Sequence, residues 1–211
     1  MVSERNRILE LVNYIESLGI TVNCAKNKAR GNKGFFKVKA EKFRIDIAQG
    51  LSDEEILRVL VHEFSHYIHY KNDKTLKSLN FILPTIDNLL LEELITLTVD
   101  AIPKETIEPL FKMHERLEKE VNSIKKDKNS FVMYLELQSK ERLLKSVKTK
   151  MQRVNRYYNS KTELFARSME QFILNVENFR LRAPNLYNLY SEFVETKKDL
   201  ELNNFLEILL K

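Results

Sequence analysis

Apolar and polar positions follow two patterns along the chain. Apolar residues recur at helical spacing at the start, which predicts a helix over 3–18 that ends at Gly19. From residue 36 apolar and polar positions alternate, which predicts two strands, 36–40 and 43–47, joined as a hairpin near Glu41-Lys42. Beyond residue 50 the spacing of apolar residues is helical again.

The long helical part of the sequence begins with a capping box. Ser52 is followed three residues later by Glu55, which is typical of a helix start, and we expect this helix to run to about Tyr70. Further helices are predicted over 86–101, 105–126, 131–157, 162–179 and 186–210, the last of them broken. The sequence therefore predicts one α+β domain over 1–211, predominantly α-helical, with a small β-sheet near the N-terminus.

Composition narrows the class of protein. The 211 residues are 43% hydrophobic and 31% charged, which excludes a disordered tail and a membrane protein. The first residues carry mixed charge and no apolar run, so no secretory signal is expected. Because Cys24 is the only cysteine, an internal disulfide framework is excluded. We expect a soluble cytoplasmic protein with no membrane partner.

The most specific chemistry lies in the HExxH pattern formed by His62, Glu63 and His66. On a helix the two histidines lie one turn apart on the same face, so both imidazoles can bind one metal ion. Glu63 points in a neighbouring direction, where its carboxylate can hold a metal-bound water and accept its proton during attack on a carbonyl group. We expect the metal to be Zn2+.

With this motif the chain resembles the zincin metallopeptidases. The resemblance implies a zincin-like fold, in which a small sheet accompanies an HExxH active-site helix and an edge strand aligns the peptide by main-chain hydrogen bonds. The predicted order of elements over 36–66 fits, and we expect 43–47 to be the edge strand. The expected function is a zinc-dependent metallopeptidase that hydrolyses peptide or protein substrates by Glu63-assisted attack of a zinc-bound water.

A catalytic zinc site needs a third protein ligand, and the remaining histidines are poor candidates. His69 lies about 10.5 Å along the helix axis from His62, too far for one zinc to bind both together with His66. The metzincins place a glycine turn before their third histidine, and no glycine follows Gly50, so that family is excluded. His114 lies in a stretch rich in Lys and Glu, which is typical of a solvated helix.

A glutamate from a later helix is the third ligand in gluzincins, and two segments offer one. Glu92 and Glu93 follow the motif at a spacing similar to that of compact gluzincin-like peptidases. Alternatively, residues 157–173 closely resemble the ELFARAFE segment of metallopeptidase-like domains in polyvalent proteins of phages and conjugative elements. That resemblance implies Glu163 as the ligand and a helical insertion at about 71–156 between the two motif helices.

The second segment departs from its relatives at Lys161, where proline is expected, and at Ser168-Met169, where Ala-Phe is usual. Glu163 also has a structural interpretation, because Ser160 three residues earlier is spaced as a capping box. Glu170, two turns further on, is a candidate to orient a ligand histidine. The same segment offers candidates whose roles the sequence leaves open: Arg167 for binding a substrate carboxylate or pairing with an acid, and Tyr157 or Tyr158 for stabilising an oxyanion or for packing alone.

Basic residues gather in two segments, 26–44 and 125–161. Within 131–157 they recur at about helical spacing, and such a helix can bind phosphate groups or an acidic partner, although nothing resembles a defined nucleic-acid-binding motif. The alternative function is therefore a catalytically inactive zincin-like fold acting as a basic helical module that binds nucleic acid or protein. The presence of Glu63 beside both histidines favours the peptidase.

Overall fold

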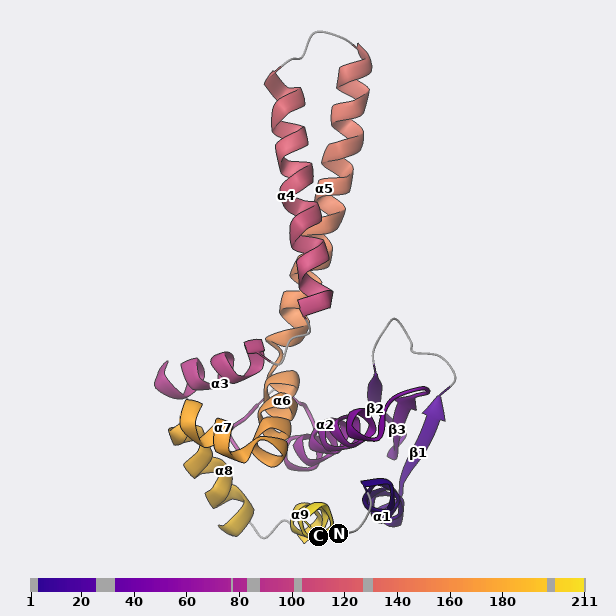
Figure 1. The fold of residues 1–211 in the computed structure, drawn as a ribbon, viewed down its shortest axis with the longest axis vertical. Coiled ribbons are helices and arrows are strands. Elements are labelled where there is room, and N and C mark those ends of the chain that lie inside the picture. The colour runs from indigo at the N-terminus through magenta and orange to yellow at the C-terminus, as the bar shows by residue number, and fades with distance from the viewer. Residues whose placement is uncertain are drawn as a thin grey trace. The chain divides into compact units, whose positions relative to one another are not determined.

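The computed structural model of the protein describes residues 4–25, 33–76, 78–82, 88–100, 104–126, 131–196 and 200–210. As the sequence predicted, the fold is α+β and predominantly helical, with a three-stranded sheet (Figure 1). In chain order the elements are α1 (Glu4–Ser17), β1 (Ile20–Ala25), β2 (Gly34–Lys39), β3 (Lys42–Ala48), α2 (Asp53–Asn72), α3 (Asn88–Asp100), α4 (Lys104–Lys126), α5 (Phe131–Tyr158), α6 (Lys161–Leu174), α7 (Val176–Arg182), α8 (Pro184–Thr196) and α9 (Leu200–Leu210).

The sheet has the strand order β1-β3-β2. β3 pairs antiparallel with β2 as the predicted hairpin, with Ala40 and Glu41 in the turn, and parallel with β1 on its other side. The expectation that 43–47 forms the edge strand is therefore wrong, because β3 is the central strand. Our sequence analysis did not predict β1, and in the described sheet β1 and β2 form the two edges.

α2 begins at the predicted capping box and passes through the hydrophobic core. The Ser52 hydroxyl accepts a hydrogen bond from the Glu55 backbone N–H at 3.2 Å, and Glu55 Oε2 accepts one from the Ser52 backbone N–H at 3.0 Å. Further along the helix Leu60, Phe64 and Ile68 are almost fully buried. The glutamate and the two histidines of the HExxH pattern are thus carried by a helix that the core fixes in place.

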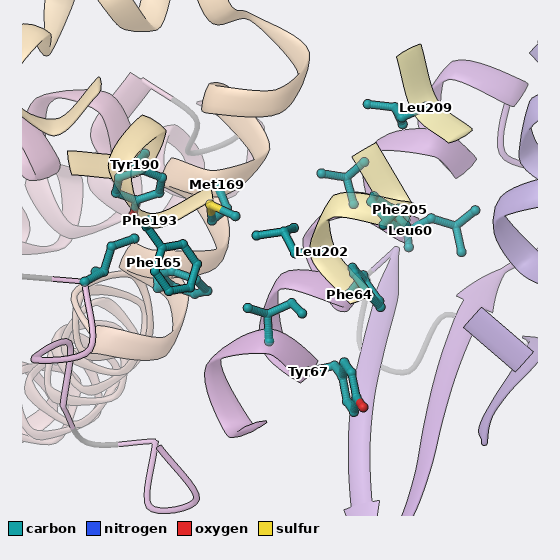
Figure 2. Packing of buried hydrophobic residues seen from close by; sticks show 14 of the residues in the cluster. Leu60, Phe64, Tyr67, Phe165, Met169, Tyr190, Phe193, Leu202, Phe205 and Leu209 are labelled. Atoms are coloured by element: carbon teal, nitrogen blue, oxygen red, sulfur yellow. The ribbon is translucent and has the colours of Figure 1, made fainter. Parts of the chain in front are cut away.

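The last helix closes the same core. Phe205 of α9 stacks on Phe64 with ring centroids 4.3 Å apart, and Figure 2 shows this pair beside Leu60 and Leu202. The Tyr14 hydroxyl of α1 donates a hydrogen bond to the Glu201 carbonyl at 2.8 Å. The first and last helices of the described chain are therefore joined to each other and to α2.

The chain divides into two compact units. The first contains Met1–Thr98 and Lys161–Lys211, and the second contains Val99–Ser160. The second unit is a hairpin of α4 and α5, in which Lys125 pairs with Glu141. It starts later than the insertion predicted at about 71–156, since most of α3 belongs to the first unit. No helix in the described ranges is both long and apolar enough to cross a membrane.

Candidate metal centre

α2 presents His62 and His66 one turn apart on the face that packs against α6. Their rings meet edge to face, with centroids 4.9 Å apart and planes at 89°. His66 is buried and His62 is partly buried. The helical spacing of the HExxH pattern therefore brings both imidazoles to one place.

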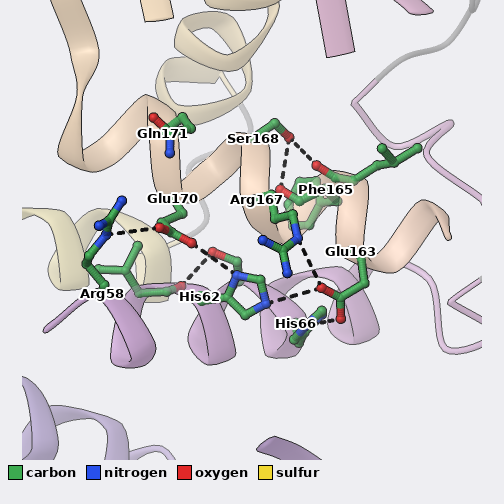
Figure 3. A network of polar contacts seen from close by, with 12 residues as sticks. Arg58, His62, His66, Glu163, Phe165, Arg167, Ser168, Glu170 and Gln171 are labelled. Atoms are coloured by element: carbon green, nitrogen blue, oxygen red, sulfur yellow. Dashed lines mark hydrogen bonds and ion pairs between the residues drawn. The ribbon is translucent and has the colours of Figure 1, made fainter. Parts of the chain in front are cut away.

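Glu163 comes to the same place from the first turn of α6 (Figure 3). Its Oε2 lies 3.5 Å from Nε2 of His62, and its Oε1 lies 3.4 Å from Nε2 of His66. One possible ligand atom from each residue lies within 4.8 Å of the others. In the described ranges no other three histidine, cysteine or acidic side chains form such a group.

Glu170 holds His62 in the orientation that a metal ligand needs. Glu170 Oε2 lies 3.2 Å from His62 Nδ1, and Arg58 Nε donates a hydrogen bond to Glu170 Oε1 at 3.3 Å. When the carboxylate accepts a hydrogen bond from Nδ1–H, the lone pair of the imidazole is on Nε2, which faces Glu163. Our sequence analysis considered this role for Glu170 and did not find Arg58.

The charges around the imidazoles favour a bound cation. Burial lowers the pKa of His62, but Glu163 and Glu170 outweigh it and raise that pKa to about 10. Burial likewise opposes the charge of Glu163, while hydrogen bonds from His62 and His66 hold its pKa well below the usual value. Without a metal, a proton on His62 balances these carboxylates. With that proton released, the two nitrogens and one oxygen form a donor set that suits Zn2+.

Glu63 lies beside the three candidate metal ligands, His62, His66 and Glu163, but is not one of them. The side chain is 6% exposed, and burial raises the pKa of its carboxyl, against the lowering effect of His62 and His66. A hydrogen bond with the backbone of Phe36 in β2 also lowers it. Glu63 is therefore a buried carboxylate next to the imidazoles, with more affinity for a proton than an exposed glutamate.

Gly34, the first residue of β2, lies directly against Glu63. A Cβ added at Gly34 would overlap Cγ1 of Val59 and stand 2.8 Å from Oε1 of Glu63. The backbone of β2 therefore comes as close to α2 as a residue without a side chain allows. Gly34 was not identified from the sequence, because a close approach between two elements leaves no mark in a single sequence.

Arg167 is a further member of the site. Its Nε lies 3.5 Å from Oε2 of Glu163 (Figure 3), and its side chain is 12% exposed. Of the two roles considered from sequence, pairing with an acid is the one that the contacts show. Glu163 is thus flanked by a guanidinium as well as by two imidazoles.

The other histidines lie outside this group. His69 is fully buried, with Nε2 2.9 Å from the Ser78 carbonyl and its ring against Phe81 and Phe165. His114, in α4, lies 3.9 Å from Glu118 on the next turn. Neither histidine belongs to the group, as expected from the sequence, but His114 is only partly exposed and not the solvated residue that was expected.

The alternative glutamates have other surroundings. Glu93 accepts hydrogen bonds at the start of α8, from the Asn185 side chain at 2.7 Å and the Leu186 backbone N–H at 2.9 Å. Glu92 is exposed. Tyr157 and Tyr158 pack edge to face against each other at the end of α5, with centroids 5.2 Å apart. The structure therefore brings Glu163, and not the alternative pair, to the two histidines of the motif.

Comparison with known proteins finds no matching family, no matching curated protein and no matching solved structure.

Proposed function

We propose that this protein is a zinc-dependent metallopeptidase of the gluzincin type, with a zincin-like fold. The observation that carries the proposal is the group of His62, His66 and Glu163, whose ligand atoms lie within 4.8 Å of one another. Two imidazole nitrogens and one carboxylate oxygen are the three protein ligands of such a catalytic zinc site. The resemblance of residues 157–173 to the ELFARAFE segment supports the same assignment.

Zinc bound there supplies a Lewis acid that polarises a carbonyl group and lowers the pKa of a coordinated water. Glu63 acts as the general base that takes the proton from the attacking water and passes it to the leaving amine. Its raised pKa supports this role, since a base with a pKa closer to neutral transfers protons more effectively. Glu170 and Arg58 keep His62 in its binding orientation.

β2 replaces β3 as the strand that aligns the substrate. It is an edge of the described sheet, and its first residue, Gly34, lies against Glu63. A peptide that pairs with β2 by main-chain hydrogen bonds would pass close to the carboxylate that activates the water. Recognition through the main chain makes the substrate class peptides and proteins.

The test is zinc content together with peptide hydrolysis, measured on protein purified without a metal-affinity tag. We expect about one zinc per chain in the wild type and its loss in Glu163→Gln, because one of three ligands is removed. Glu63→Gln should keep zinc and lose hydrolysis of a quenched fluorescent peptide library, since only the base is changed.

Glu92→Gln is the matched control, because it removes one exposed carboxylate from a helix of the same unit. It should keep both zinc and activity. Full zinc content in Glu163→Gln would disprove the metal site. Equal activity of the wild type and Glu63→Gln would disprove the mechanism.

A further inference from the structure

The second half of α5 carries a run of basic residues without acidic ones. Residues 142–158 contain six Lys or Arg and no Asp or Glu. Four of them lie within about a quarter of the helix circumference and are exposed. We name this set the cationic stripe; it consists of Arg142, Lys145, Arg153 and Arg156.

The stripe lies in a part of the hairpin without counter-charges. Cations of α4 and of the first half of α5 pair with carboxylates, as Lys119 does with Glu115 at 2.9 Å and Lys140 with Glu120 at 2.5 Å. Within the described residues, no carboxylate lies within ion-pair distance of the four stripe residues. Their positive charges are therefore left for a ligand outside the chain.

The side chains in and around the cationic stripe indicate which class of anionic ligand it binds. The apolar side of this helix segment is already used inside the hairpin, where Val147 is 3% exposed, so it cannot enter a lipid layer as an interfacial helix does. Ser146 and Gln152 lie between the cations and are exposed, whereas the hydroxyl of Thr149 donates to the Lys145 carbonyl at 2.9 Å. The stripe therefore offers hydrogen-bond donors and no central aromatic or aliphatic anchor of the kind that protein interfaces use.

The dimensions fit a regular polyanion. Arg142 and Arg156 are separated by about 21 Å along the helix axis, the length of roughly six base pairs of a duplex. Basic side chains together with hydroxyl and amide groups are the usual contacts to backbone phosphates. We propose that the cationic stripe binds the phosphate backbone of double-stranded nucleic acid without reading its bases.

This proposal is independent of the peptidase, because the stripe belongs to the second unit and the metal ligands belong to the first. The test is fluorescence anisotropy of the full chain with labelled DNA and RNA duplexes of about 24 base pairs, across about 50–200 mM salt. We expect tighter binding at lower salt, and similar affinity for duplexes of unrelated sequence. Replacing the four stripe residues by Gln should weaken binding at least about tenfold and reduce the slope of log affinity against log salt by about 3 to 4.

The matched control removes four cations of α4 that each pair with a carboxylate. Its substitutions are Lys112→Gln, Arg116→Gln, Lys119→Gln and Lys125→Gln. Both variants lose four positive charges. If the cationic stripe is the binding site, only the stripe variant should lose binding. Circular dichroism checks that both stay folded. Equal loss in the two variants, no binding by the wild type at about 50 mM salt, or binding to phosphatidylserine vesicles alone would overturn the proposal. Preference for the DNA or the RNA duplex identifies which of the two is the ligand.

Discussion

At the scale of single residues, the site depends on the absence of a side chain at Gly34 as much as on the groups that are present. Glu63 is the proposed base, and its Oε1 lies 2.8 Å from the place that a Cβ at Gly34 would take. Burial also raises the pKa of the Glu63 carboxyl. The position of the base is thus fixed by a contact between a strand and a helix.

Gly34→Ala should therefore reduce peptide hydrolysis while zinc stays bound, because the new methyl group overlaps Val59 and crowds Glu63, and neither residue is one of the three proposed ligands. The free energy of unfolding should fall by about 1–3 kcal/mol, the cost of an overpacked contact. Zinc analysis, hydrolysis rates and urea unfolding of the same preparation measure these effects. Lys39→Ala, at the exposed end of the same strand, serves as the control, and full activity in Gly34→Ala would contradict this account.

Single residues also show where prediction from sequence stops. His62 and His66 follow from helical spacing alone, since four residues make one turn. Glu163 and Glu93 could not be separated by such reasoning, because each lies far along the chain from the motif. Long-range packing decides between them, by placing Glu93 at the start of α8 and Glu163 at the imidazoles.

At the scale of elements, β3 is unusual for a strand of alternating sequence, because it is buried on both faces from Ile45 onward. Asp46 is only 4% exposed, and it pairs with Lys37 at 2.6 Å and with Arg44 at 2.5 Å. The salt bridges with Lys37 and Arg44 make the burial of Asp46 possible, while the unpredicted strand β1 pairs with the second edge of β3 and makes it the central strand. The edge position expected for 43–47 was wrong because the short strand β1 went unrecognised beside a stronger helical pattern.

Asp46→Asn should destabilise the protein in a manner that depends on pH. Burial raises the pKa of the Asp46 carboxyl, but hydrogen bonds from Arg44 and Lys37 hold it below the ordinary 3.8. A lower pKa in the folded state means that ionised Asp46 stabilises the fold above pH 3.8, and that this contribution is lost as the pH falls through the lowered value. We expect a loss of about 1–3 kcal/mol at neutral pH.

Urea unfolding of both proteins at neutral pH and below pH 3.8 measures this difference. The gap in unfolding free energy between the wild type and Asp46→Asn should narrow progressively below pH 3.8, because Asp46 becomes protonated as the pH approaches its lowered pKa. Glu10→Gln, an exposed carboxylate of α1, should show no such narrowing. A gap of constant size would show that the pairing of Asp46 contributes nothing that depends on its charge.

At the scale of the whole molecule, the first unit is assembled from the two ends of the chain. α9 brings Phe205 onto Phe64 of α2, and Glu201 receives hydrogen bonds or ion pairs from Tyr14 and Lys71. The predominance of helix and the presence of a small sheet followed from apolar periodicity. The pairing of α1 with α9 did not, since a single sequence records no contacts between segments so far apart.

Phe205→Ala should lower the free energy of unfolding by about 3–5 kcal/mol, because it leaves a cavity beside a fully buried ring. Urea or thermal unfolding measures the change. Leu210→Ala, on the same helix but 78% exposed, is the control and should change stability little. If both variants lost a similar amount of unfolding free energy, α9 would stabilise the protein through its helical propensity and not through the packing of Phe205.

The interruption of the first unit by a hairpin affects how the protein is made. α4 and α5 are neighbours in sequence and form local contacts, so they can pair as soon as both have left the ribosome. α2 is synthesised earlier, yet Phe64 has no Phe205 to cover it, and His66 has no Glu163 beside it until 97 further residues have been added. A nascent chain therefore has an exposed apolar helix that chaperones can recognise, and no complete metal site. The proposed metal site cannot form until translation has passed Glu163, because this residue is its third ligand.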